Sequence, residues 1–89
     1  MPARFRVLLT PSFQRDLERL PIDVQERVFK AIGALETSPF TPPPRIKRLK
    51  ARSVGQWRLE VWPYRIRYDV EGCDVVLYRV RHRKEIYRD

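Results

Sequence analysis

Cysteine is almost absent from this sequence: Cys73 is the only one in 89 residues, so no disulfide can form within the chain. A single cysteine also lacks the paired spacing by which proteins hold structural zinc. Chains without disulfides are typical of reducing compartments rather than of secretion. We therefore expect no disulfide framework, no metal site and no bound cofactor.

Long apolar runs are missing as well. The apolar run within residues 1–9 is too short for a signal peptide, and no stretch approaches the roughly 20 apolar residues that span a bilayer. The sequence has no internal repeat and no low-complexity tract. A chain of this length can bury one modest core. These observations predict a single domain over residues 1–89, no contact with a membrane and a cytoplasmic location.

Positive charge, by contrast, is abundant and unevenly placed. The net charge is +8 at pH 7; residues 1–42 hold six basic and five acidic side chains, whereas residues 43–89 hold thirteen and six. The excess of positive charge in residues 43–89 is expected to attract phosphate backbones, and this attraction weakens as salt is added. A solvated surface and an acidic protein partner are the two other interpretations. We favour nucleic acid, and a basic cluster follows the midpoint of the chain: Arg45, Lys47, Arg48, Lys50 and Arg52.

The first half of the chain predicts a strand and two helices. Alternation over residues 5–9 indicates a short strand, and Thr10 or Ser12 can cap the helix that follows. Pro21 separates this helix from a second one, which is expected to end near Pro39. The apolar residues recur at helical spacing, namely Phe13, Leu17 and Leu20 in the first helix and Val24, Val28, Phe29, Ile32 and Leu35 in the second.

The second half predicts three antiparallel strands after a stiff proline connector at residues 42–44. Alternating or dense apolar residues mark the strands at 57–62, 64–70 and 75–80. The predicted fold class is α+β: an N-terminal strand, a two-helix hairpin and a three-stranded antiparallel meander, with the helices packed on one side of the sheet. Four aromatic residues are expected to fill the core: Phe29, Trp57, Tyr64 and Tyr68.

Arginines take matching positions on the predicted strands. Arg65 and Arg67 share a parity and therefore a face, while Arg58 and Glu60 project from the neighbouring strand. If the last strand stays regular, one of its faces carries three further arginines: Arg79, Arg81 and Arg83. Guanidinium groups donate bidentate hydrogen bonds to phosphate oxygens and stay charged at physiological pH. The pattern therefore predicts a phosphate-binding surface.

The carboxyl-terminal segment adds the only histidine, His82, and a nearby tyrosine, Tyr87. Histidine titrates near neutral pH and can act as acid or base, and tyrosine can stack on a base or hydrogen-bond a reacting hydroxyl. Each residue also has a plain structural interpretation as a packed side chain. Together they are candidates for proton transfer.

Five short motifs span nearly the whole chain: Leu20-Pro21, Leu49-Lys50, Trp57-Arg58-Leu59, Tyr64-Arg65-Ile66-Arg67-Tyr68 and His82-Arg83-Lys84-Glu85-Ile86-Tyr87. In this order they resemble the RelE branch of the RelE/ParE toxin superfamily. The resemblance implies a small toxin of a toxin–antitoxin pair that cuts messenger RNA in the ribosomal A site without a metal. Its implied partners are a neighbouring antitoxin chain that wraps it, the ribosome with its messenger RNA, and operator DNA only through the antitoxin complex.

The resemblance also implies roles for single residues. Arg58 would hold the phosphate, and Arg65 would stabilise the transition state. Arg83 would be the arginine of the carboxyl-terminal motif. Tyr87 would stack on the substrate base or assist proton transfer, and His82 would share that proton work. The remaining basic residues are expected to bind RNA: Arg45, Lys47, Arg48, Lys50, Arg52, Arg67, Arg81 and Lys84.

Glu60 departs from the family pattern. Active relatives commonly carry a second basic residue at this position, two residues after Arg58. A carboxylate near a phosphate opposes binding unless it acts as a base or forms an ion pair with Arg58 or Arg65. We favour the cross-strand ion pair.

Two other functions fit the same resemblance. One is a ParE-type inhibitor of DNA gyrase, although that branch tends to lack the carboxyl-terminal basic and aromatic residues that Arg83 and Tyr87 supply here. The other is an inactive toxin relic that acts with its antitoxin as a DNA-binding co-repressor. Glu60 keeps this second alternative open.

Overall fold

Five strands and three helices make up the described part of the chain, which comprises residues 4–40, 46–48 and 55–86 of this computed structural model. For residues 46–48 and 85–86 only the backbone is described. The elements are β1 (Arg6–Leu9), α1 (Pro11–Glu18), α2 (Ile22–Leu35), β2 (Ile46–Arg48), β3 (Trp57–Val61), β4 (Tyr64–Glu71), β5 (Asp74–His82) and α3 (Arg83–Ile86).

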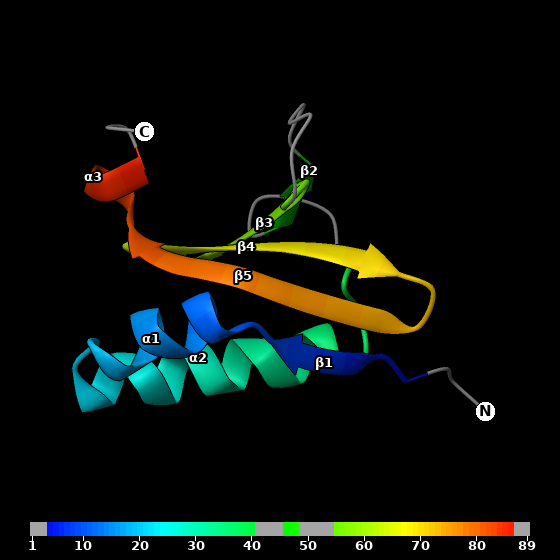
Figure 1. Cartoon of the computed structure of the whole chain (residues 1–89), viewed down its shortest axis with the longest axis horizontal. Helices are drawn as coiled ribbons and strands as arrows, with labels where there is room; N and C mark the ends of the chain where they lie inside the picture. Colours follow the sequence, from blue (N-terminus) through cyan, green and yellow to red (C-terminus); the bar gives the residue numbers. More distant parts are fainter. Residues whose placement is uncertain (1–3, 41–45, 49–54, 87–89) are drawn as a thin grey trace.

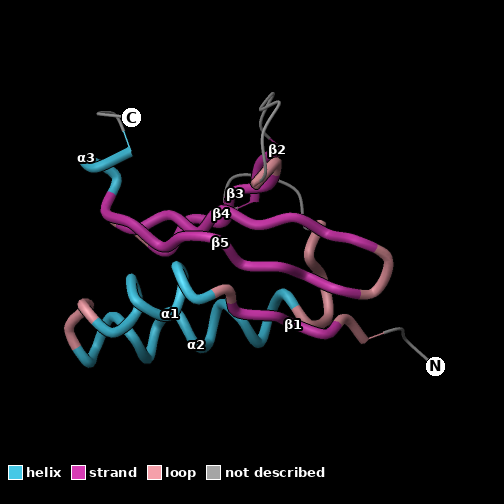
Figure 2. The backbone as a smooth tube through the Cα atoms, viewed as in Figure 1, coloured by secondary structure: helices cyan, strands magenta, loops and turns pink. Residues whose placement is uncertain are grey.

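The strands form one mixed sheet in the order β1-β5-β4-β3-β2. β1 runs parallel to β5, and every other pair of neighbours is antiparallel. Figure 1 shows α1 and α2 together on one side of β4 and β5, and the tube of Figure 2 shows the same two layers. This arrangement confirms the predicted α+β fold. Among the described helices, none has the length and apolar character that crossing a membrane requires.

The sheet is larger than the predicted three-stranded meander. β3, β4 and β5 form that meander, but β2 adds a strand within the basic segment and β1 joins the opposite edge. β2 has only three residues, so its existence depends on pairing with β3 rather than on a pattern of its own. α2 ends at Leu35, short of Pro39. The predicted connector at residues 42–44 lies outside the described residues.

Thr10 fixes both the start of α1 and its position against the sheet. Its Oγ1 accepts a hydrogen bond from the Phe13 backbone N–H at 3.2 Å, so Thr10 is the N-cap, one of the two residues predicted for that role. The same hydroxyl donates to the Leu77 carbonyl oxygen on β5 at 2.9 Å. An N-cap of this kind contributes about 1 kcal/mol. Thr10 therefore couples the first helix directly to β5.

The core lies between the helix pair and the sheet. Its buried members are Phe13, Leu17, Val24, Val28, Leu35, Leu59, Val61, Ile66, Tyr68, Val75, Leu77 and Val80. Trp57 and Tyr64 pack against this core as predicted. Phe29 is 52% exposed, so the prediction that it fills the core was wrong. Neighbouring helix residues point about 100° apart, and the full burial of Val28 turns Phe29 toward solvent.

Tyr68 supplies a buried polar contact that makes stability depend on pH. Its side chain is fully buried, and its hydroxyl donates a hydrogen bond to the Pro39 carbonyl oxygen at 2.7 Å. Burial raises the pKa of Tyr68, because the anion loses solvation that the neutral phenol does not need. The contribution of buried Tyr68 to the free energy of unfolding is therefore complete below the ordinary tyrosine pKa of about 10. It declines as the pH rises above that value.

We expect Tyr68→Phe to lower the free energy of unfolding by about 1–2 kcal/mol at pH 8, because the Pro39 carbonyl oxygen loses its donor. The difference in free energy of unfolding between variant and wild type should shrink above pH 10. There the unfolded wild type loses the Tyr68 hydroxyl proton, which favours unfolding, whereas phenylalanine has no such proton. Urea denaturation followed by circular dichroism at pH 8, 10 and 11 measures both effects. A difference that stays constant across these values would show that Tyr68 does not carry the alkaline dependence.

An ion pair ties α1 to β5. The Asp16 carboxylate accepts hydrogen bonds from Arg79 Nε at 2.7 Å, from Arg79 Nη2 at 3.1 Å and from the Val80 backbone N–H at 3.2 Å. The pair lies at a shift in the β4–β5 register, where Arg67 faces Arg79 but Tyr68 faces Leu77. This shift lets Val80, instead of Arg79, continue the buried row after Leu77. It interrupts the regular alternation that was predicted for Arg79 and the arginines after it.

Candidate functional site

Pairing across β3, β4 and β5 distributes their side chains between the two faces of the sheet. Residues directly opposite each other on neighbouring strands share a face. Glu60 pairs with Arg65, which in turn pairs with Arg81, and Arg58 pairs with Arg67 in the next row. We call these five residues the arginine face. The residues that alternate with them are buried on the helix side: Leu59, Ile66 and Val80.

Glu60 lies between two of these arginines. Its Oε1 atom is 3.3 Å from Arg65 Nε and 3.7 Å from Arg58 Nη2. The side chains are largely shielded, with exposed fractions of 11% for Arg65, 20% for Arg58 and 26% for Glu60. The predicted ion pair is therefore confirmed with both arginines. Arg58 also has a buried Nε atom that finds no hydrogen-bond partner among the described residues, so its donors are not all used by the fold.

Arg67 serves the fold more directly than the sequence suggested. Its Nε donates to the Gly55 carbonyl oxygen at 2.7 Å, at the approach to β3. Gly55 has a φ of 83°, and a Cβ at this position would lie 3.2 Å from the Arg67 Cβ. The Asp69 carboxylate accepts hydrogen bonds from the backbone N–H groups of Gly55 and Gln56 at 2.9 and 2.7 Å. Arg67 and Asp69 thus hold the entrance to β3, although Arg67 was predicted as an RNA contact.

Arg83 leaves the last strand and begins α3, so it does not continue the strand parity that was predicted for it. Its backbone N–H donates to the Pro63 carbonyl oxygen at 2.9 Å. Its guanidinium carbon lies 4.7 Å from the centroid of the Trp62 ring, a cation–π contact. Trp62 follows Arg58 and Glu60 in the same alternation, so Arg83 is held at the end of the arginine face.

Trp62 is a candidate residue that the sequence interpretation missed. The side chain is 55% exposed, a large fraction for so apolar a residue, and it lies at the turn between β3 and β4. An exposed indole can stack on an unpaired base or on an arginine. The signal was present in the sequence, because Trp62 has the outward parity of Glu60.

His82 lies on the other side of the sheet. It is directly opposite Tyr64, and the two rings meet edge to face with centroids 5.4 Å apart. Its Nδ1 atom accepts a hydrogen bond from the Lys84 backbone N–H at 3.2 Å. His82 lines a cavity of about 390 Å³ beside the turn between α1 and α2, together with Arg19, Arg81 and other residues. The structure therefore does not bring His82 together with Arg58 and Arg65.

Several predicted site residues fall outside what the structure describes. These are Tyr87, Arg45, Lys50 and Arg52. Lys47 and Arg48 belong to β2, where the register places Lys47 opposite Arg58 and Arg48 opposite Trp57. Lys84 is exposed in α3. Among the described side chains, no three acidic, cysteine or histidine residues come together in a way that could hold a metal ion.

Comparisons with known proteins give consistent results. Residues 7–87 match the family model described as the ParE toxin of the type II toxin–antitoxin system parDE. The chain is 31% identical over 84 residues to Toxin RelE3 of Methanocaldococcus jannaschii, an alignment that covers 92% of this chain and 94% of that protein.

Solved structures with the same fold include two antitoxin–toxin complexes. One is the RelB–RelE complex of Methanococcus jannaschii, which matches with a TM-score of 0.74 and 29% identity over 91% of this chain and 95% of the matched chain. The other is the toxin–antitoxin complex RelBE2 of Mycobacterium tuberculosis, with a TM-score of 0.76 and 28% identity over 89% of this chain and 98% of the matched chain.

Proposed function

This chain belongs to the ParE toxin family and is a RelE-like toxin of a type II toxin–antitoxin system, and we propose that it is an endoribonuclease that cleaves messenger RNA in the ribosomal A site. Related chains occur in complexes with RelB antitoxins, and a cognate antitoxin is the partner of this one. The proposal adds the ribosome and its messenger RNA as targets, with operator DNA reached only through the antitoxin complex.

The row of Glu60, Arg65 and Arg81, with Arg58 beside it, is the observation that carries the proposal. Cleavage would proceed by attack of a ribose 2′-hydroxyl on the adjacent phosphorus. The 2′-hydroxyl gives up its proton to water as a bond forms between O2′ and phosphorus, and the bond from phosphorus to O5′ breaks, leaving a cyclic phosphate and, once O5′ is protonated, a 5′-hydroxyl. Negative charge builds on the phosphate oxygens, and preorganised guanidinium groups neutralise it.

In this mechanism Arg58 holds the phosphate and Arg65 stabilises the transition state, with Arg81 opposite Arg65 as a further cation. Arg83 and Tyr87 complete the site from the carboxyl-terminal segment. Tyr87 is proposed to give the proton that O5′ needs or to stack on the substrate base. His82, which packs against Tyr64 on the opposite face, is left without a direct step.

An open sheet surface of this size cannot orient a flexible RNA by itself, and correct positioning supplies much of the barrier reduction. The ribosome would provide that positioning. The basic segment of residues 45–52 is proposed to contact ribosomal RNA backbones, because clustered lysine and arginine side chains suit electrostatic attraction. The exposed Lys84 would add to this contact.

Primer extension on messenger RNA from cells that briefly express the chain tests the proposed function. We expect new cuts in a translated transcript and none in the same transcript with its ribosome-binding site removed. Gyrase supercoiling activity should be unchanged in extracts of the same cells. Growth arrest with inhibited gyrase and no cuts would instead assign the chain to the ParE-type activity, and absence of both effects would favour a co-repressor relic.

Trp62→Ala is expected to weaken binding of a short single-stranded RNA by about 1–3 kcal/mol, the usual contribution of one stacked base. The substitution also removes the ring on which Arg83 lies. Fluorescence anisotropy with an RNA whose 2′-hydroxyls are blocked measures the change. Phe29→Ala is the matched control, because Phe29 is a similarly exposed aromatic residue on the helix layer. Equal effects of both substitutions would contradict a role for Trp62 in RNA binding.

A further inference from the structure

Glu60 is the one carboxylate within the arginine face, and it contacts the same donors that a phosphate would use. A carboxylate and a phosphate both present paired oxygens to a guanidinium group. In this chain Glu60 Oε1 lies 3.3 Å from Arg65 Nε and 3.7 Å from Arg58 Nη2. A phosphate bridging Arg58 and Arg65 would therefore meet a position that already holds an anion.

The geometry of this contact is loose compared with the ion pair of Asp16 and Arg79. Asp16 binds Arg79 through two hydrogen bonds, of 2.7 and 3.1 Å, and is only 9% exposed. The shortest contacts of Glu60 with its two arginines are longer, at 3.3 and 3.7 Å, and its side chain is 26% exposed. The ion pair of Asp16 and Arg79 holds α1 against β5. The Glu60 carboxylate, in contrast, can be replaced by another anion at small cost.

We propose that Glu60 is an internal competitor for the phosphate-binding position: in the free chain its carboxylate occupies the place between Arg58 and Arg65, and a substrate phosphate must displace it. The identity of that phosphate as RNA rests on the proposed function. The competition itself rests only on the three side chains. RNA free in solution then binds weakly, while RNA held on the ribosome at high local concentration displaces Glu60. The carboxylate thereby favours ribosome-bound substrate.

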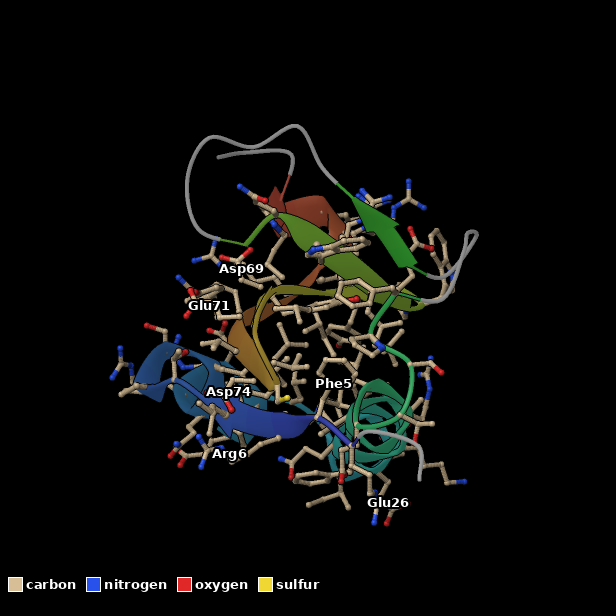
Figure 3. All side chains as sticks on the ribbon, turned by 90° about the vertical axis from the view of Figure 1, so that its right-hand side faces the viewer. Phe5, Arg6, Glu26, Asp69, Glu71 and Asp74 are labelled. Carbon is tan, nitrogen blue, oxygen red and sulfur yellow. The ribbon has the colours of Figure 1, made fainter. Side chains whose placement is uncertain are left out.

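Titration of the full chain with inorganic phosphate at constant ionic strength tests the competition. The Nε–H resonances of Arg58 and Arg65 report occupancy of the position. We expect Glu60→Gln to bind phosphate about tenfold more tightly than the wild type, because the amide keeps the shape and removes the competing charge. Glu26→Gln is the matched control: it makes the same change in net charge on α2, in the helix layer (Figure 3), and should bind as the wild type does.

Any of three results would overturn the inference. The first is equal phosphate affinity of Glu60→Gln and wild type, and the second is an equal gain for Glu26→Gln, which would reduce the effect to net charge. The third is a loss of affinity in Glu60→Gln, because Glu60 would then position the arginines. Glu60→Ala serves as a second variant if the glutamine variant unfolds. A chain that shows the expected gain but never cuts messenger RNA would keep this inference and contradict the proposed function.

Discussion

Arg65→Ala is expected to slow cleavage of ribosome-bound messenger RNA by about 100- to 1000-fold, the usual effect of removing one preorganised donor to a developing oxyanion. Arg65 is the middle residue of the row formed with Glu60 and Arg81, and only 11% of its side chain is exposed. A shielded guanidinium interacts more strongly with charge than an exposed one. The rate is measured with purified ribosomes carrying a defined messenger RNA in the A site.

Arg65→Lys separates geometry from charge in the same assay. Lysine keeps the positive charge but lacks the planar fork, so its rate should fall between those of wild type and Arg65→Ala. Arg15→Ala, on the exposed side of α1, is the control and should cleave at the wild-type rate. Thermal denaturation must first show that all variants are folded. If Arg65→Ala keeps its rate within a few-fold of wild type, Arg65 does not contact the transition state.

Asp16→Ala is expected to lower the free energy of unfolding by about 2–3 kcal/mol. Removal of one partner from a fully buried ion pair costs about 3–5 kcal/mol, and we expect less here because Arg79 is 41% exposed and regains some solvation. The Val80 backbone N–H also loses its acceptor. Urea denaturation followed by circular dichroism measures the loss, which is large for a domain of this size.

Glu18→Ala is the control for this substitution, since Glu18 is an exposed acidic residue on the same helix. We expect its effect to stay within about 0.5 kcal/mol, as is usual for surface changes. The double variant with Arg79→Met should be more stable than Asp16→Ala alone, because it removes a partly shielded charge that has lost its Asp16 carboxylate. A loss below about 0.5 kcal/mol for Asp16→Ala would mean that this ion pair does not hold α1 against β5.

Periodicity in the sequence predicted most of the fold. The helical spacing of Phe13 and Leu17 and the alternation along β3 and β4 are local signals, and each identified its element. β2 was missed because three residues carry no pattern and the strand exists through its pairing with β3. Phe29 was misplaced because an apolar residue at the border of a helical stripe is buried or exposed according to the packing of its neighbours, which the sequence alone does not determine.

The candidate site was predicted in part. The residues whose positions follow from alternation along a regular strand were placed correctly, and the others were not. Alternation grouped Arg65 with Arg67 and Arg58 with Glu60, and a cross-strand ion pair of Glu60 was predicted. The pairing of β3 with β4 brings the two groups together and forms that ion pair. His82 was grouped with them as part of a motif, although its parity differs from that of Arg81. Arg83 was expected on a regular strand, but β5 ends at His82. The position of Arg83 against Trp62 depends on a turn between other strands and has no local signal.

The two faces of the sheet place different requirements on their residues. Residues such as Ile66 and Val80 face α1 and α2 and must stay apolar and well packed, whereas Arg58 and Arg65 are not part of that apolar core. Substitutions on the face opposite the helices, apart from residues such as Arg67 that hold the fold, leave this core unchanged. The charge of the arginine face can thus change through a few substitutions while the helix side keeps the same architecture. Glu60 illustrates this, because its carboxylate alters the charge among the arginines without entering the apolar core.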